Sequence, residues 1–263
     1  MLLREVEYAR PASVDEAIRL LAANDGARAL AGGQTLINVM KARVASPDVL
    51  VDLWGLEELR GIRLADGGLE LGAMVTYSQL MTSSEVATAR PILAEVAGQI
   101  ADVQVRNRGT IGGNVCSNDP TNHLPPLLVA LDARFTIAGA GGERTVSAEE
   151  FFVGVYMTAV GTGELLTRIA IPPGSRDGFA AVTIGKDGTC IVSAAASLDG
   201  EGGPRIAIGC VDAVPVLVRD VGEVAGAVTM PPSDVHASAE YRMHLAQVLA
   251  ARAVQQAKGR TAA

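Results

Sequence analysis

Two short glycine-containing motifs carry most of the chemistry that the amino-acid sequence suggests. They are Ala31–Thr35 (AGGQT) and Thr110–Asn114 (TIGGN). Paired glycines allow positive φ angles, so that successive backbone N–H groups can converge on an anion, and each motif also supplies a hydroxyl group. A single Gly-Gly pair is more often an ordinary turn. Two such motifs that meet in space, however, can hold the two phosphates of a dinucleotide from opposite sides.

The sequence lacks the signatures of several other cofactor and hydrolase sites. It contains no Gly-x-Gly-x-x-Gly, Gly-x-x-x-x-Gly-Lys, His-Glu-x-x-His or Gly-x-Ser-x-Gly segment. Classical NAD binding and P-loop chemistry are therefore not supported. No side chain has the setting of a general acid or base for carbon chemistry, so we assign no catalytic residue.

The first motif follows directly on a predicted strand. Ala27–Ala31 is a short apolar segment that runs into the glycine pair, and a second strand is predicted at Val49–Leu53. Between them, Leu36–Val44 has apolar residues at helical spacing. Upstream, Ser13 and Glu16 have the spacing of a capping box and predict the start of an amphipathic helix.

The second motif is surrounded by further elements. Gly61–Gly72 reads as a hairpin around Asp66-Gly67-Gly68, and Thr76–Gln79 has the spacing of a capping box. After the motif, Leu127–Leu131 is predicted to be a short buried helix opened by two prolines, and Arg134–Ala138 a strand.

A strand followed by a linker rich in Pro, Gly and Ser suggests a domain boundary near Pro172. A strand at Ile169–Ile171 runs into the linker-like segment Pro172–Ser175. Beyond it, strands are predicted at Ile191–Leu198 and Arg205–Ile208, and a closing helix from about Ser233 to Lys258.

Composition and charge exclude several classes of partner. The 263 residues are 49% hydrophobic and only 3% aromatic, which allows a substantial core but disfavours stacked-aromatic binding of single-stranded nucleic acid. The net charge of −7 also disfavours a nucleic-acid partner. No apolar run approaches the ~20 residues of a membrane span, and Arg4, Glu5 and Glu7 interrupt any signal-peptide pattern. We therefore expect a cytoplasmic protein without a membrane span.

The cysteines and histidines are too scattered to predict a metal site. Cys116, Cys190 and Cys210 form no Cys-x-x-Cys pair, so this chain alone is not expected to bind zinc or an iron–sulfur cluster. Cys116 is expected to be a buried small residue. His236 and His244 are predicted to be surface residues on one helix.

With the residues around them, the two motifs resemble the FAD-binding medium subunit of molybdenum hydroxylases. This group includes the carbon monoxide dehydrogenase flavoprotein and the flavin domain of xanthine dehydrogenase. The resemblance is carried mainly by Ala31–Ile37, by Val105–Asn114 (VRNRGTIGGN) and by Asp119–Pro120. It implies an α+β fold, with a FAD-binding domain of the PCMH type at 1–172 built from two α+β subdomains, about 1–55 and 56–172. A smaller α/β C-terminal domain at 173–263, with an antiparallel sheet and helices, would follow.

The resemblance also implies which residues contact FAD. The two motifs would wrap its pyrophosphate and adenosine end. Ile100 would lie near the ring system, and Leu166 would line the pocket from the strand before the linker. His123 stands where the family commonly has Asp, and Asp119 and Asn118 are close enough in sequence to replace that contact. The implied cofactor-binding residues are Leu30, Ala31, Gly32, Gly33, Gln34, Thr35, Leu36, Ile37, Ile100, Thr110, Ile111, Gly112, Gly113, Asn114, Asp119, His123, Leu166 and Lys186.

The function implied by the resemblance is electron transfer within a heteromeric molybdenum hydroxylase. A large molybdenum-cofactor subunit would oxidise the substrate, and a small subunit with two-iron iron–sulfur clusters would pass electrons to this chain. FAD would deliver them to NAD, oxygen or another acceptor. The assembly implied is a heterotrimer or a dimer of heterotrimers.

Two other classes of function remain open at this point. One is a self-contained flavin oxidoreductase, which would need its own substrate pocket and a proton donor near the flavin. The other is a scaffold subunit that keeps the fold without FAD. The sequence identifies neither the substrate of the assembly nor the electron acceptor.

Overall fold

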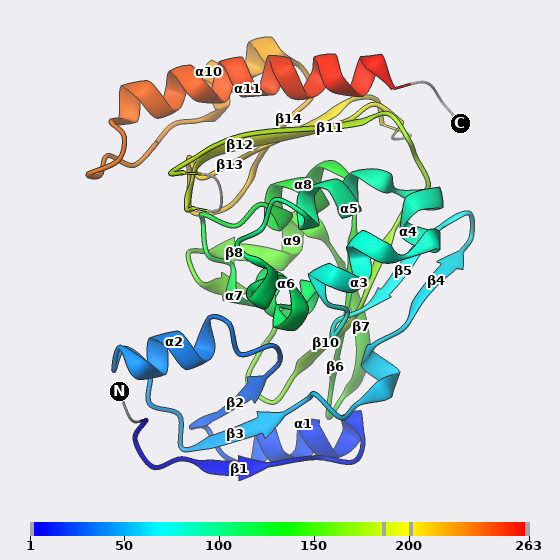
Figure 1. The fold of residues 1–263 in the computed structure, drawn as a ribbon, viewed down its shortest axis with the longest axis vertical. Coiled ribbons are helices and arrows are strands. Elements are labelled where there is room, and N and C mark those ends of the chain that lie inside the picture. The colour runs from blue at the N-terminus through cyan, green and yellow to red at the C-terminus, as the bar shows by residue number, and fades with distance from the viewer. Residues whose placement is uncertain (1–2, 186–187, 200–201, 261–263) are drawn as a thin grey trace.

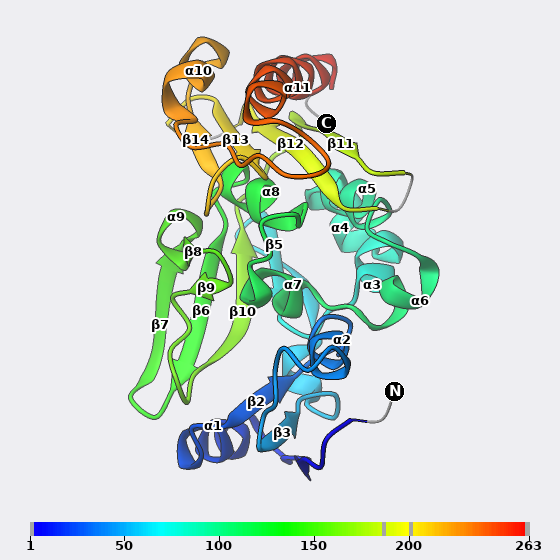
Figure 2. The ribbon, with the colours of Figure 1, turned by 90° about the vertical axis from the view of Figure 1, so that its left-hand side faces the viewer.

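The computed structural model describes residues 3–185, 188–199 and 202–260. Three sheets follow one another along its long axis, with helices between and around them (Figures 1 and 2). The mixture of helices with largely antiparallel sheets is the α+β fold that the resemblance implied.

The N-terminal sheet is parallel and three-stranded, in the order β1-β3-β2. Parallel neighbours need crossover connections, and two helices provide them. Ser13 Oγ accepts a hydrogen bond from the Glu16 N–H group, which confirms the predicted helix start. The elements are β1 (Glu7–Ala9), α1 (Val14–Ala23), β2 (Ala27–Leu30), α2 (Leu36–Lys41) and β3 (Val49–Asp52).

The central sheet is antiparallel, in the order β4-β5-β10-β6-β7, and one face packs against short helices. The hairpin β4–β5, the Thr76–Gln79 capping box and the buried helix α8 confirm three sequence predictions. The strands are β4 (Ile62–Ala65), β5 (Gly68–Gly72), β6 (Arg134–Gly139), β7 (Gly142–Ser147) and β10 (Leu165–Ile171). The helices are η1 (Glu57–Leu59), α3 (Tyr77–Thr82), α4 (Ser84–Ala89), α5 (Pro91–Ala97), α6 (Val103–Arg108), α7 (Ile111–Ser117), α8 (Leu124–Ala130) and α9 (Ala148–Phe151), and a small hairpin follows with β8 (Phe152–Gly154) and β9 (Met157–Thr158).

The C-terminal sheet is antiparallel, in the order β11-β12-β13-β14, and lies between α11 and the central helices α5 and α8 (Figure 1). Its alanine-rich strands allow α11 to pack closely on the outer face. The elements are β11 (Asp177–Thr183), β12 (Cys190–Ser197), β13 (Arg205–Gly209), β14 (Val216–Val218), η2 (Val221–Glu223), α10 (Val224–Ala227) and α11 (Ala239–Gly259).

The last helix begins later than the sequence suggested. Asp234 accepts hydrogen bonds from the N–H groups of His236 and Ala237 and so closes a turn, and Ser238 then caps α11. The prediction that His236 and His244 share one helix is therefore wrong, because His236 lies in this turn. Both histidines are exposed, as expected.

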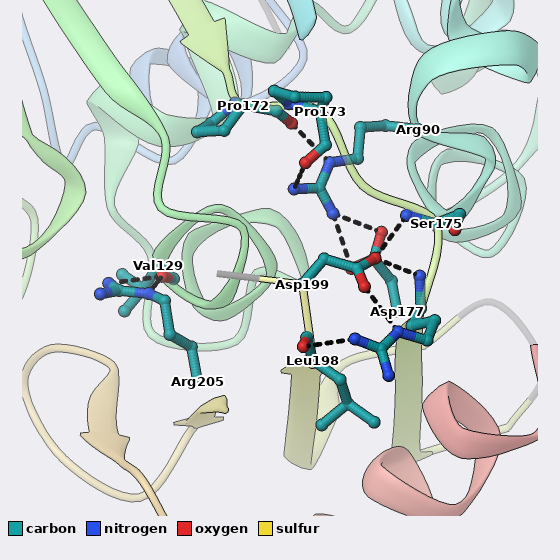
Figure 3. Close-up of polar contacts among 10 residues, drawn as sticks. Arg90, Val129, Pro172, Pro173, Ser175, Asp177, Leu198, Asp199 and Arg205 are labelled. Carbon is teal, nitrogen blue, oxygen red and sulfur yellow. Dashed lines mark hydrogen bonds and ion pairs between the residues drawn. The ribbon is translucent and has the colours of Figure 1, made fainter. Parts of the chain in front are cut away.

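A buried arginine fixes the linker between the central and C-terminal sheets (Figure 3). Arg90, between α4 and α5, places Nη1 2.7 Å from each carboxylate oxygen of Asp177. It also donates to the carbonyl oxygens of Pro172 and Pro173, at 2.7 and 3.0 Å. The pair is almost fully buried, with side-chain exposures of 3% and 1%. The linker is thus held rigidly against the central helices.

A second arginine joins the two parts of the chain from the C-terminal side. Arg205 of β13 donates to the carbonyl oxygen of Val129 in α8 and to Glu149. Phe179, of β11, belongs to the same buried cluster as the central sheet. The division into domains at 172/173 therefore stays a prediction, because the core is continuous across it.

We expect Asp177→Ala to lower the free energy of unfolding by about 3–5 kcal/mol, because it leaves the buried Arg90 charge without a partner. Urea denaturation of the purified chain measures this. Arg63→Ala is the matched control: it removes an ion pair with Glu70 whose arginine is 65% exposed, and should cost less than about 1 kcal/mol. Equal losses in the two variants would contradict the role of the Arg90–Asp177 pair.

Candidate cofactor-binding site

The two glycine motifs meet where the N-terminal sheet approaches the central helices. A Cβ atom added at Gly32 would lie 2.0 Å from the carbonyl oxygen of Arg108, the last residue of α6. One added at Gly113 would lie 3.5 Å from the Cβ atom of Ala31. Only glycine permits the first of these approaches. The structure therefore brings together the two motifs that the sequence singled out.

The first motif has the open backbone geometry expected of an anion site. It follows the carboxyl end of β2, and Gly33 has a φ of 73°. Within the described residues, the N–H groups of Gly33, Gln34 and Thr35 donate no hydrogen bond. The Gln34 side chain folds back and donates to the Gly32 carbonyl oxygen at 3.0 Å. Three consecutive donors are thus left for a ligand.

The second motif differs from the prediction, because it is a helix start and not an open loop. Thr110 Oγ1 accepts from the Gly113 N–H group at 3.0 Å and caps α7. The N–H groups of Ile111 and Gly112 donate to the carbonyl oxygens of Val75 and Ala73, at 2.9 Å each. The expected positive φ angles are absent from Gly112 and Gly113. These N–H groups are already satisfied, so the motif is not an anion nest.

The glycines of the second motif serve close packing instead. A Cβ atom added at Gly112 would lie 2.5 Å from the Ala73 carbonyl oxygen. The helix start can therefore press against the segment that follows β5. The same closeness places Asn114, the last residue of the motif, in a buried position at 9% exposure.

Asn114 presents a buried acceptor without a partner. Its Oδ1 atom has no hydrogen-bond partner among the described residues. Burial raises the pKa of the neighbouring Tyr77 to about 12, while a hydrogen bond from Asn114 opposes that shift. An unsatisfied buried carbonyl is costly, so a ligand that donates an N–H or O–H group here would stabilise the site.

A pocket of about 310 Å³ lies on the first motif, at the low end of the range for small-molecule sites. Lys41 and Arg108 give it two positive charges. Its lining residues are Leu30, Ala31, Gly32, Gly33, Gln34, Ile37, Asn38, Lys41 and Arg108. Open N–H groups beside two cations form a site suited to a phosphate-containing ligand.

The guanidinium of Arg108 is positioned by an aromatic ring. Its Cζ atom lies 3.7 Å from the ring centroid of Trp54, and that of Arg60 lies 4.4 Å from the same centroid. Sequence reasoning did not single out Trp54 or Lys41. Trp54 could have been found because it follows the carboxyl end of β3, which lies next to β2, where ligands of parallel sheets bind.

The other predicted contact residues lie around the central helices. Ile100 is half-buried and Leu166 is buried in β10, and both contact the central core. Asp119 accepts hydrogen bonds from the backbone and side chain of Thr121, at 2.9 and 2.8 Å. Lys186 lies outside the described residues.

His123 points toward the C-terminal sheet. Its ring centroid lies 5.4 Å from that of Phe179, and its side chain is buried beside Cys190. It does not line the pocket on the first motif. The ring faces β11 and not that pocket, and the contact of His123 with FAD stays a prediction.

The described residues include neither a metal-binding cluster nor a membrane-spanning helix. Among residues 3–185, 188–199 and 202–260, no group of three or more His, Cys, Asp or Glu side chains is arranged to hold a metal ion. No helix within the same ranges combines the length and apolar character needed to cross a bilayer.

Comparison with protein families matches two parts of the chain. Residues 4–174 match the FAD binding domain in molybdopterin dehydrogenase. Residues 214–257 match the C-terminal domain of the CO dehydrogenase flavoprotein.

Individual relatives match over nearly the whole length. The chain is 37% identical to the carbon monoxide dehydrogenase medium chain of Afipia carboxidovorans, over 99% of both chains. It is 32% identical to the nicotine 6-hydroxylase medium subunit of Paenarthrobacter nicotinovorans, over 99% of this chain and 100% of that one. Among solved structures, a chain of carbon monoxide dehydrogenase from Hydrogenophaga pseudoflava matches with a TM-score of 0.94 and 33% identity, over 100% of both chains.

We expect Gly32→Ala to lower the free energy of unfolding by at least about 1–3 kcal/mol, because the new methyl group must displace the Arg108 backbone. Thermal or urea unfolding measures this. Gly141→Ala is the control, since no atom lies within 4 Å of a Cβ added there. A Gly32→Ala protein as stable as the control would contradict the close contact of the motifs.

Proposed function

This chain belongs to the family that carries the FAD binding domain in molybdopterin dehydrogenase, and on that premise we propose that it is the electron-transfer subunit of a molybdenum hydroxylase. Its cofactor is FAD, and it is a flavoprotein subunit of an oxidoreductase. The observation that carries the proposal is the pocket where three open N–H groups, Lys41 and Arg108 surround the first glycine motif.

The residues present fit the phosphate end of FAD. The diphosphate is an anion that accepts hydrogen bonds, which matches the N–H groups of Gly33, Gln34 and Thr35 and the charges of Lys41 and Arg108. Gly32 lets the segment that ends at Arg108 approach the first motif closely, so that Arg108 lines the same pocket. The unpartnered Asn114 Oδ1 supports a ligand that also donates a hydrogen bond.

The ring system of FAD would lie farther along the same side of the central helices. The half-buried Ile100 supplies apolar surface for it, and Asp119 a carboxylate close to the end of α7, while Leu166 lies buried in the core of the central sheet. When bound, FAD supplies a ring that accepts and releases electrons, which no side chain of this protein can do. The protein binds the cofactor, orients it and limits the access of water.

The proposed partners are a large molybdenum-cofactor subunit and a small subunit with two-iron iron–sulfur clusters. Relatives of similar length are a medium chain of carbon monoxide dehydrogenase and a medium subunit of nicotine 6-hydroxylase, which supports a place in a multi-subunit enzyme. Electrons would pass from the iron–sulfur clusters through FAD to an external acceptor. The assembly proposed is a heterotrimer or a dimer of heterotrimers.

The visible absorption spectrum of the purified chain tests the cofactor. We expect a flavin spectrum that survives desalting, or returns when FAD is added, and that bleaches with a reductant. A chain that takes up no FAD would overturn the proposal.

Co-purification tests the partners. The tagged chain purified from its source should bring down molybdenum and iron in proportion to the flavin. Recovery of flavin without either metal would contradict the proposed assembly.

We expect Arg108→Gln to raise the dissociation constant for FAD by roughly ten-fold or more, because a charge-assisted contact with the diphosphate contributes about 1.5–3 kcal/mol. Titration of the apoprotein, followed by flavin fluorescence, measures this. Arg19→Gln, which removes an exposed arginine of α1 outside the pocket, should leave the dissociation constant unchanged. Equal constants in the two variants would exclude Arg108 from the phosphate site.

A further inference from the structure

Away from the FAD pocket, two cysteines are buried together with a histidine and a serine between α8 and the C-terminal sheet. Cys190 begins β12, Cys210 follows β13, Ser193 lies in β12 and His123 precedes α8. Their exposures are 2%, 5%, 0% and 7%. None of these side chains is explained by the binding of FAD to the first motif.

The strand register brings the two cysteines to the same end of the sheet. In the antiparallel pair of β12 and β13, Ser193 is opposite Gly209, so that Cys210 comes one residue after the last paired position. The pairing of β12 with β11 is irregular between Val192 and Cys190. A bulge of this kind turns a side chain away from strict alternation, which lets Cys190 and Ser193 face the same neighbours.

Helix α8 covers the cluster from the other side. A Cβ atom added at Gly209 would lie 2.7 Å from Pro126 Cγ and 2.7 Å from Ser193 Oγ. His123, directly before this helix, packs its ring against Phe179 of β11. The cluster is therefore enclosed by parts of the chain that lie on both sides of the linker.

The two thiols differ in acidity because of their neighbours. The Cys210 thiol and the His123 imidazole lower the pKa of Cys190, against the effect of burial. The Cys190 sulfur and burial raise the pKa of Cys210. One sulfur of the pair thus ionises readily while the other keeps its proton. A thiolate beside a protonated thiol is the arrangement of an attacking and a resolving cysteine.

The backbone around the pair is held in an unusual conformation. Cys210 has a φ of 67°, which is rare for a residue other than glycine. Arg242 of α11 donates to the carbonyl oxygens of Cys210 and Ile191 and so fixes both chain segments. The Ser193 hydroxyl lies against both thiols and lowers the pKa of each. Strained backbone beside a buried polar cluster is more typical of a functional site than of plain core.

We propose that Cys190 and Cys210 form a reversible intramolecular disulfide when the protein meets a hydroperoxide. The Cys190 thiolate attacks one peroxide oxygen, the O–O bond breaks, and with one proton the leaving oxygen becomes water or an alcohol. The resulting sulfenic acid is then attacked by the Cys210 sulfur, which loses its proton, and the hydroxyl leaves as water. Two thiols lose two electrons and two protons, and the peroxide gains them.

His123 is a positioning residue in this reaction, since it acts through the Cys190 sulfur. The imidazole directly precedes α8, and therefore makes the reactivity of the pair depend on how the C-terminal sheet sits against the central helices. The disulfide would in turn fix the ends of β12 and β13 beside α8. The inference concerns the interface between α8 and the C-terminal sheet and does not depend on the proposed function.

The test uses the full-length protein, reduced and then treated with hydrogen peroxide. Peptide mapping by mass spectrometry should find the peptides of Cys190 and Cys210 joined, with the mass of two hydrogens lost, and a dithiol should restore them. Cys116 is the internal control: the residue is half-buried and not fully buried as the sequence suggested, but desolvation raises the pKa of its thiol to about 12, so it should stay reduced. The oxidised protein should melt a few degrees higher, because the cross-link restricts the unfolded chain.

Variants separate the roles of the residues. Cys210→Ser should accumulate a sulfenic acid on Cys190 that a dimedone probe captures, whereas Cys190→Ser should give no adduct on Cys210. His123→Gln should slow disulfide formation about ten-fold or more. His244→Gln, which changes an exposed histidine of α11, should leave the rate unchanged.

The mapping of the unmodified sequence decides the proposal, whether or not a variant folds. Thiols of Cys190 and Cys210 that survive peroxide in the folded protein would overturn it. So would oxidation of each cysteine separately to sulfinic acid, or disulfides that join either one to Cys116 or to a second chain.

Discussion

The contact between the backbones of Gly32 and Arg108 is the constraint on which the rest of the site depends. A single methyl group at Gly32 would lie 2.0 Å from the Arg108 carbonyl oxygen, so the two parts of the chain approach more closely than any residue other than glycine would allow. This approach sets the N-terminal parallel sheet against the central helices. It also carries the Arg108 side chain to the edge of the pocket, where Trp54 holds its guanidinium. The shape of the pocket and the position of the Arg108 charge therefore both depend on this one close contact.

The two glycine motifs divide the work of the site between them. The first leaves its N–H groups open and follows a parallel strand, as anion sites commonly do. In the second motif the N–H groups donate to Thr110 Oγ1 and to carbonyl oxygens of the segment after β5, and the glycines allow close packing. Similar sequence patterns thus serve different purposes, because Thr110 caps a helix while Thr35 makes no capping hydrogen bond.

Local patterns predicted the fold well, whereas residues that depend on distant neighbours were harder to place. Capping pairs such as Thr76 and Gln79, and the hairpin around Asp66, are encoded within a few residues. The N–H group of Gly112 finds its acceptor, the Ala73 carbonyl oxygen, in another segment, and the orientation of His123 depends on a sheet contributed by residues far along the chain. The family resemblance indicated FAD but not which motif has free donors. Those features arise from tertiary contacts, which a local pattern does not contain.

The ring that holds Arg108 has a further consequence, because Trp54 is the only tryptophan of the chain. Two guanidinium groups, 3.7 and 4.4 Å from its centroid, set the electric field that its indole experiences. Any event that draws Arg108 away from the ring changes that field at a single chromophore. The intrinsic tryptophan fluorescence of the protein therefore reports on the position of Arg108 without an added label. No other indole contributes to this signal.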